Sequence, residues 1–188
     1  MNPFLGVASL VALLAGASVS SASIIGDVTG GGVFSDDVST ADGWVLNSSA
    51  GNGVDFWTLT IDTPSYLSVT VDAEIDFGIS VYRGAVSDSI GFAFDNAASF
   101  EDPVTFEFGT FIAGTPNLGF AGSSLEDIFL STSGIYTIAV GGSDFGFAAP
   151  YPYDLAVNVS AVPLPSTAWL FFSGLAGFRG WAKRRTTA

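Results

Sequence analysis

The alternation of apolar and polar residues over Leu67–Val81 constrains the fold more than any other feature of the sequence. Every odd-numbered position in this stretch is apolar, and the even positions are mostly Ser, Thr, Asp or Glu. A period of two indicates a half-buried β-strand, because successive side chains point to opposite faces. The stretch is longer than one ordinary strand. We therefore predict a turn near Ala73–Asp76 that joins two strands of one sheet.

The same pattern predicts further strands, and together they indicate an all-β fold. These strands cover Asp55–Asp62, Val104–Phe108, Ile135–Val140 and Tyr153–Ser160. Short strands with Gly-rich connections favour a single jelly-roll-like β-sandwich over residues 23–161. Ser124–Leu130 could form one helical turn. Three segments are predicted to be irregular: Thr29–Trp44 as part of a loose lead-in within 23–54, and Gly84–Phe100 and Phe111–Ser124 as long connections.

Residues 1–22 have the pattern of a signal peptide. An apolar run, Leu5–Ala17, is followed by small residues, which predicts a helix and then cleavage between Ala22 and Ser23. The segment before the run lacks Lys and Arg, which is atypical, and an uncleaved membrane anchor is the alternative.

The tail, residues 162–188, has three parts in order. Val162, Pro163, Leu164 and Pro165 should be extended, because proline fixes φ and removes a backbone donor. A membrane helix of about 166–182 would be roughly 25 Å long, near the lower limit for crossing a bilayer. Lys183, Arg184 and Arg185 then form a basic membrane stop on the cytoplasmic side. A permanent anchor and a buried core helix are the alternatives.

This tail resembles the PEP-CTERM sorting signal of Gram-negative bacteria in its VPLP form. Residues 162–165 match the motif, and 183–185 match its basic end. The resemblance implies export, a temporary anchor in the inner membrane, and cleavage near the motif by an exosortase-type enzyme. It further implies release to the cell surface or extracellular matrix, often beside exopolysaccharide. Leu164 stands where the commoner form has Glu, so a variant processing enzyme is expected.

The domain has a weaker resemblance to the bacterial pre-peptidase C-terminal domain, a jelly-roll β-sandwich appended to secreted enzymes. The order of its strand patterns carries this likeness, in particular DFWTL from Asp55, ISVY from Ile79, GIYTIAV from Gly134 and YDL from Tyr153. Relatives of that fold bind calcium, and some bind matrix polymers, but the family's acidic motif is not recognisable in this chain.

The composition excludes several kinds of chemistry. The chain has no Cys and no His, which removes disulfides, thiol chemistry and imidazole bases or ligands. Between the two ends, Arg83 is the single base against eighteen carboxylates, a balance that repels nucleic acid. No cofactor is expected, although oxygen ligands would suit calcium.

Two acidic groups are candidate calcium ligands. Asp72, Glu74 and Asp76 share one face at a period of two, and the alternative is a solvated strand edge and turn. Asp36 and Asp37 with Asp42 form the second group, for which the alternative is a polar loop.

Aromatic residues could stack on sugars. Trp57 is in phase with core positions and is predicted to be buried, whereas Trp44 and Tyr82 are the better exposed candidates beside Tyr66. The sequence thus predicts an exported, non-catalytic surface or matrix protein. A secreted calcium- or carbohydrate-binding module is the alternative, and a small carboxylate-based hydrolase is the second.

Overall fold

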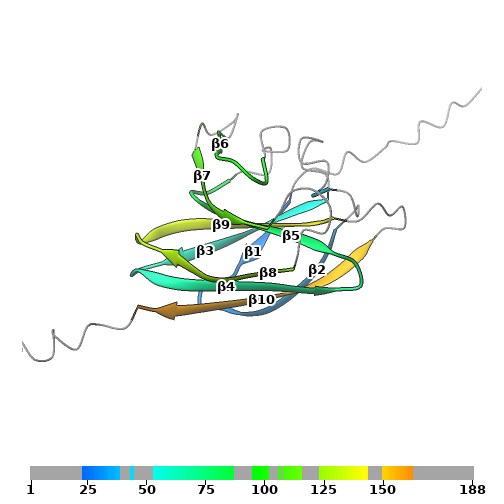
Figure 1. Ribbon diagram of the computed structural model, residues 1–188, viewed down its shortest axis with the longest axis horizontal. Coiled ribbons are helices and arrows are strands. Elements are labelled where there is room, and N and C mark those ends of the chain that lie inside the picture. Colours follow the sequence, from blue (N-terminus) through cyan, green and yellow to red (C-terminus); the bar gives the residue numbers. More distant parts are fainter. Residues whose placement is uncertain are drawn as a thin grey trace, which may run out of the picture.

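The computed structural model describes residues 23–38, 43–44, 53–86, 95–101, 106, 108–115, 123–143 and 150–162. These residues form ten strands in two sheets and no helix, which confirms the predicted all-β class (Figure 1). The two predicted terminal helices fall outside the described residues.

One layer is a six-stranded sheet. In spatial order its strands are β1 (Ser23–Asp27), β3 (Val54–Ile61), β9 (Gly134–Gly142), β5 (Phe77–Arg83), β7 (Phe108–Gly114) and β6 (Phe100–Glu101). β1 pairs with β3 in parallel, and the remaining pairs are antiparallel.

The other layer is a four-stranded antiparallel sheet. Its order is β2 (Gly32–Val38), β10 (Tyr151–Ala161), β4 (Ser65–Ala73) and β8 (Ser124–Leu130). The main core lies between the two sheets.

The turn predicted after Ala73 is confirmed, but the prediction that it joins two strands of one sheet is wrong. β4 ends at Ala73 in the four-stranded sheet, and β5 begins at Phe77 in the six-stranded sheet. The odd-numbered apolar residues of both strands enter the same core from opposite sides. Alternation specifies which face of a strand is buried, but it carries no information about which strand is the partner.

β8 corrects the prediction of a helical turn over Ser124–Leu130. Leu125 and Ile128 both pack against the core, and their spacing of three resembles a helical pattern. A β-bulge produces this spacing, because Val69 pairs with Leu125 whereas Leu67 pairs with Ile128. Asp127 adopts a positive φ of 53° within this irregularity.

Two segments predicted to be irregular also contain strands. β2 lies inside the predicted lead-in, and β7 extends into the predicted connection that begins at Phe111. In β2, Phe34, Asp36 and Val38 are more buried than their neighbours, so one acidic residue interrupts the inward apolar pattern. Pairing with β10 along seven residue pairs outweighs the turn preference of Gly and Asp. Of the predicted strand Val104–Phe108, residues 104, 105 and 107 fall outside the described residues.

A second apolar cluster covers the outer face of the six-stranded sheet. It contains Trp44, Val54, Phe56, Tyr82, Phe100 and Ala139. The Trp44 amide N–H donates to the Gly142 carbonyl at 2.8 Å, and the Asn96 side-chain amide donates to the Trp44 carbonyl at 2.7 Å. Both faces of β5 are therefore buried.

The chain enters and leaves the sandwich at opposite ends. Ser23 pairs with Asp55 at the start of β3, and this is the entry end. Ala161 pairs with Ser65, and the Val162 N–H donates to the Pro64 carbonyl at 3.2 Å, just beyond the end of β3. We call this the exit end; β3 and β10 both point towards it (Figure 1).

Candidate functional site

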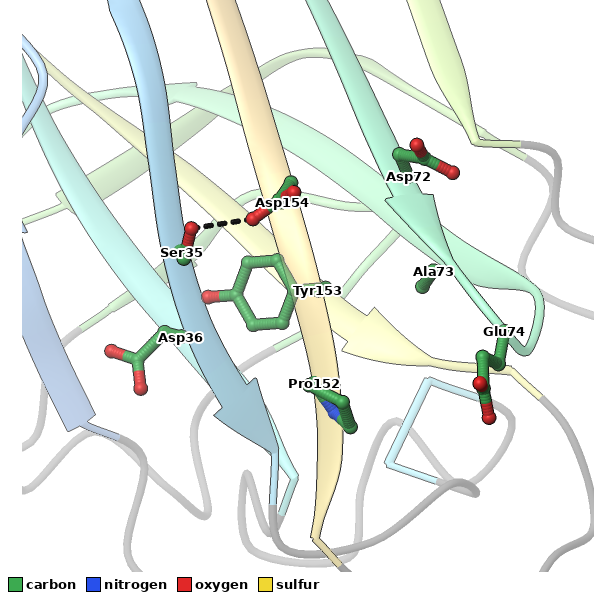
Figure 2. Close-up of a pocket in the computed structure, with 8 residues that line it drawn as sticks. All are labelled: Ser35, Asp36, Asp72, Ala73, Glu74, Pro152, Tyr153 and Asp154. Atoms are coloured by element: carbon green, nitrogen blue, oxygen red, sulfur yellow. Dashed lines mark hydrogen bonds between the residues drawn. The ribbon is translucent and has the colours of Figure 1, made fainter.

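An open groove of about 380 Å³ lies over the entry end of β10, on the four-stranded sheet (Figure 2). Its walls come from β2, β10, β4 and the residue that follows β4. The lining residues are Ser35, Asp36, Asp72, Ala73, Glu74, Pro152, Tyr153 and Asp154. Four of these eight side chains are carboxylates, so the groove is strongly acidic.

Strand register brings the groove residues together. Asp154 of β10 pairs with Ser35 on one side and with Asp72 on the other. The Ser35 hydroxyl donates to Asp154 Oδ1 at 2.5 Å, and this bond stabilises one end of the carboxylate row. Asp72 and Asp154 lie directly opposite each other on neighbouring strands, where like charges repel.

The structure brings together two of the three predicted calcium ligands. Asp72 and Glu74 both line the groove, and their side chains lie on the β4 side of β10 (Figure 2). Asp76 does not line it; its carbonyl accepts a hydrogen bond from the Ser143 N–H at 2.8 Å. Within the described part of the chain, no three carboxylates are arranged so that they could hold a metal ion.

The second predicted acidic group divides between the groove and its surroundings. Asp36 lines the groove, and its Oδ1 accepts a hydrogen bond from the Asp37 N–H at 2.8 Å. Asp42 lies outside the described residues.

Beneath the groove, a hydrogen-bonded chain of three side chains connects the two sheets. Trp57 Nε1–H donates to the Tyr153 hydroxyl at 2.9 Å, and that hydroxyl donates to Asp55 Oδ2 at 2.8 Å. Trp57 and Asp55 belong to β3, whereas Tyr153 belongs to β10. Figure 2 shows the Tyr153 hydroxyl on the same side of β10 as Asp36.

Burial perturbs the ionisable groups of this chain. Asp55 is 6% exposed, and desolvation raises its pKa to about 7, against the weaker lowering effect of the Tyr153 hydrogen bond. The charges of Asp36 and Asp37 raise it further. Burial, followed by the charge of Asp55, raises the pKa of Tyr153 far above its ordinary value.

These positions limit the chemistry of the groove. A glycoside hydrolase needs a protonated carboxyl that reaches its substrate. Asp55, whose pKa is suited to that role, is buried, accepts a hydrogen bond from the Tyr153 hydroxyl and does not line the groove. The exposed carboxylates of the groove are better suited to accepting hydrogen bonds from hydroxyl groups.

The aromatic predictions have mixed outcomes. Trp57 is buried, as predicted. The prediction that Trp44 and Tyr82 are exposed is wrong, because both belong to the second apolar cluster and are fully buried. Tyr66 is exposed and contacts Phe129, with 5.4 Å between ring centroids.

Sequence reasoning missed Ser35, Tyr153 and Asp154 as groove residues. The sequence did contain one signal for Asp154, because it occupies an outward position of a predicted strand. Its closeness to Asp72 depends on the pairing of strands about eighty residues apart, which local patterns do not specify.

The two expected processing sites lie next to the first and last described strands. Ser23 is the first residue of β1, and Val162 makes the backbone hydrogen bond that follows the end of β10. Ala22, Pro163 to Pro165, the expected membrane helix and Lys183 to Arg185 lie outside the described residues. Among the residues that are described, no helix has the length and apolar character required to cross a membrane.

No protein-family model matches the sequence, and no curated protein matches it. Among solved structures, the chain is similar to CorA, a surface-associated copper-binding protein of Methylomicrobium album BG8. The identity is 14%, the TM-score is 0.50, and the match covers 73% of this chain and all of CorA (100%). This likeness concerns the fold alone.

Two further structures match with lower TM-scores. One is the pre-peptidase C-terminal domain of a Bacillus anthracis collagenase, with 13% identity, a TM-score of 0.36, and coverage of 73% of this chain and 96% of that domain. It is the type of domain that the sequence resembles. The other is PliG, a periplasmic inhibitor of g-type lysozyme from Aeromonas hydrophila, with 17% identity, a TM-score of 0.40, and coverage of 74% and 100%. Such scores do not assign the chain to either family.

Proposed function

We propose that this protein is an exported, non-catalytic protein of the cell surface or extracellular matrix of a Gram-negative bacterium. A signal helix precedes its jelly-roll-like domain, and a short tail helix holds it in the inner membrane as an intermediate. An exosortase-type enzyme then cuts near Val162–Pro165 and releases the domain.

The agreement between the domain boundaries and the two processing sites carries this proposal. β1 begins at the residue that follows the expected signal cleavage, and β10 ends at Ala161, directly before the proline motif. Cleavage at both sites would leave every strand of the two sheets whole. The surface-associated CorA has a similar fold, and that location fits the proposal.

The experiment compares the mature protein in a native host with and without its sorting enzyme. Intact-mass measurement should place the new C-terminus at or near Pro165 in the wild-type host, with the protein outside the inner membrane. Without the enzyme, the tail should remain and the protein should stay in the membrane fraction.

A Pro163→Ala/Pro165→Ala double variant should accumulate uncut in the membrane, whereas Pro150→Ala, an exposed proline before β10, should be processed normally. An intact tail on soluble wild-type protein would contradict the proposal.

The groove suits a second candidate function, carbohydrate binding; calcium binding would need ligands beyond the described carboxylates, because no three of them are arranged to hold a metal ion. Asp72, Glu74 and Asp154 present carboxylates to solvent in a single groove. The copper binding stated for CorA is not transferred, because this chain has neither His nor Cys. A rise in melting temperature on adding calcium or a neutral polysaccharide would support the candidate function.

A further inference from the structure

The exit end of the sandwich carries a group of exposed apolar side chains. Phe108 is 55% exposed, Phe129 50%, Ile135 45% and Tyr66 37%. Tyr66 pairs with Phe129 near the start of β4, and Ile135 pairs with Thr60 near the end of β3. We call these four residues the exit patch.

One part of the exit patch surrounds a base. Phe108 and Ile135 line an open groove of about 450 Å³ together with Arg83, Gly84, Ala85, Thr110 and Gly134. Arg83 is the one Lys or Arg between residues 23 and 161. An arginine among aromatic and aliphatic side chains suits the headgroup layer of a bilayer. Its methylene groups can lie against apolar surface while its guanidinium group reaches the lipid phosphates.

The other part lies across the edge of the sandwich. Tyr66 and Phe129 belong to the four-stranded sheet, and Phe129 is on β8, which contacts β7 of the other sheet. Phe108 is the first residue of β7. The exit patch therefore has residues on both sheets at the exit end instead of covering a single sheet face.

The length of chain beyond the fold determines what lies close to this end. The last described residue is Val162, whose N–H donates a hydrogen bond to the Pro64 carbonyl at the exit end. The expected membrane helix begins at Ser166. Those four steps span at most about 14 Å when fully extended. While the tail is in the membrane, Val162 and the exit end of β10 are thus held within about 14 Å of the start of the membrane helix.

The charge distribution favours the same orientation. Asp36, Asp72, Glu74 and Asp154 line the groove at the entry end, and Asp37, Asp55 and Asp76 are close to it in sequence or register. Arg83 is at the exit end. Asp27, Asp62, Glu101, Glu126 and Asp127 lie in the exit half, and Glu101 pairs with Phe108 of the exit patch, so the surface does not require anionic lipid. Negatively charged headgroups would repel the entry end more strongly.

We propose that the exit patch is a membrane-contact surface, on which Tyr66, Phe108, Phe129 and Ile135 enter the interface of the bilayer that holds the tail. This inference rests on the proposed function, because the tail brings the surface to the membrane. The contact directs the acidic groove away from the bilayer and keeps residues 163–165 at the interface, within reach of a membrane-bound processing enzyme. Only four side chains form the contact, so it adds orientation rather than permanent attachment.

The full chain tests this without interference, because it contains no Cys. Single variants Phe108→Cys and Phe129→Cys are labelled with an environment-sensitive fluorophore and placed in vesicles of phosphatidylcholine and phosphatidylethanolamine. The matched controls are Asp37→Cys and Asp154→Cys, exposed positions at the entry end. Far-UV circular dichroism verifies the fold of each variant.

The emission of labels at positions 108 and 129 should shift to shorter wavelength in the vesicles, and nitroxide-labelled lipid should quench it. The emission of labels at positions 37 and 154 should not change. If the protein floats with the vesicles but the labels at all four positions emit as they do in water, the membrane contact is overturned and the proposed function is not. Failure of the full chain to float would instead contradict the proposed function. A blue shift that follows protein concentration and not lipid would identify a second copy as the occupant and overturn the proposal.

Discussion

The Tyr153 hydroxyl donates a hydrogen bond to Asp55 Oδ2 at 2.8 Å, and this bond joins the two sheets beneath the acidic groove. The same hydroxyl accepts a hydrogen bond from Trp57 Nε1–H. One oxygen atom thus satisfies both a buried donor and a buried acceptor. This double role makes Tyr153 the residue on which the polar part of the core depends.

Tyr153→Phe should destabilise the fold, because it leaves both Asp55 and Trp57 without their shared partner. Loss of a buried hydrogen-bond partner costs about 1–3 kcal/mol. Urea denaturation at pH 8 measures this change in the free energy of unfolding. Tyr66→Phe, which removes a hydroxyl at an exposed position, should change it by less than about 0.5 kcal/mol. Equal effects of the two variants would show that the Tyr153 bonds do not contribute.

The raised pKa of Asp55 predicts that stability falls as pH rises from about 4 to 7. The unfolded carboxyl has a pKa of 3.8 and the folded one a pKa of about 7, so the folded chain binds more protons in this window. The loss is complete about one pH unit above the folded pKa, and the contribution is then flat. The lowered pKa of Asp27, caused by hydrogen bonds from Thr29, acts in the opposite direction at lower pH.

Asp55→Asn should remove this slope, because the amide cannot ionise and its oxygen still accepts from Tyr153. At pH 8 the variant should be more stable than wild type by a few kcal/mol, an order-of-magnitude figure from a shift of about three pKa units. Thermal and urea denaturation at several pH values between 4 and 8 measure the slope. The same slope in wild type and variant would assign it to other groups.

Gly78→Ala should destabilise the second apolar cluster. A Cβ at this position would lie 2.0 Å from the Trp44 ring, so the indole must move out of a fully buried site. Overpacking of this kind typically costs about 1–3 kcal/mol. In Gly26→Ala the new Cβ would lie 3.4 Å from the Trp57 ring, an ordinary contact, and this variant is the control. Urea denaturation should separate the two; similar small losses would mean that Trp44 does not pack on β5.

Asp72→Asn should stabilise the protein slightly in the absence of metal. Asp72 is opposite Asp154, and relief of a like-charge cross-strand pair contributes about 0.2–1 kcal/mol, near the lower value for exposed groups. If calcium binds in the groove, it should raise the wild-type melting temperature and have less effect on this variant. Asp62→Asn, at the exit end, should respond to calcium as wild type does. Identical calcium responses in all three proteins would exclude the groove as the calcium site.

The candidate site was only partly predictable. Asp72 and Glu74 were recognised because carboxylates at a period of two share one face of a strand, and both line the groove. Asp154 was missed because its position beside Asp72 results from long-range pairing of β10 with β4. The burial of Asp55 had a signal that was not used: Asp55 is two residues before Trp57, so alternation places both on the same face, although carboxylates are mostly exposed.

The sequence by itself determined which residues alternate between core and surface, including the burial of Leu67, Val81 and Trp57. Only the tertiary structure decided that β4 and β5 belong to different sheets, that Trp44 and Tyr82 are buried by a second layer, and that Asp154 meets Asp72. The reason is physical. Periodicity follows from the local geometry of one strand, whereas sheet partners and the cover over an outer face depend on contacts between segments distant in the chain.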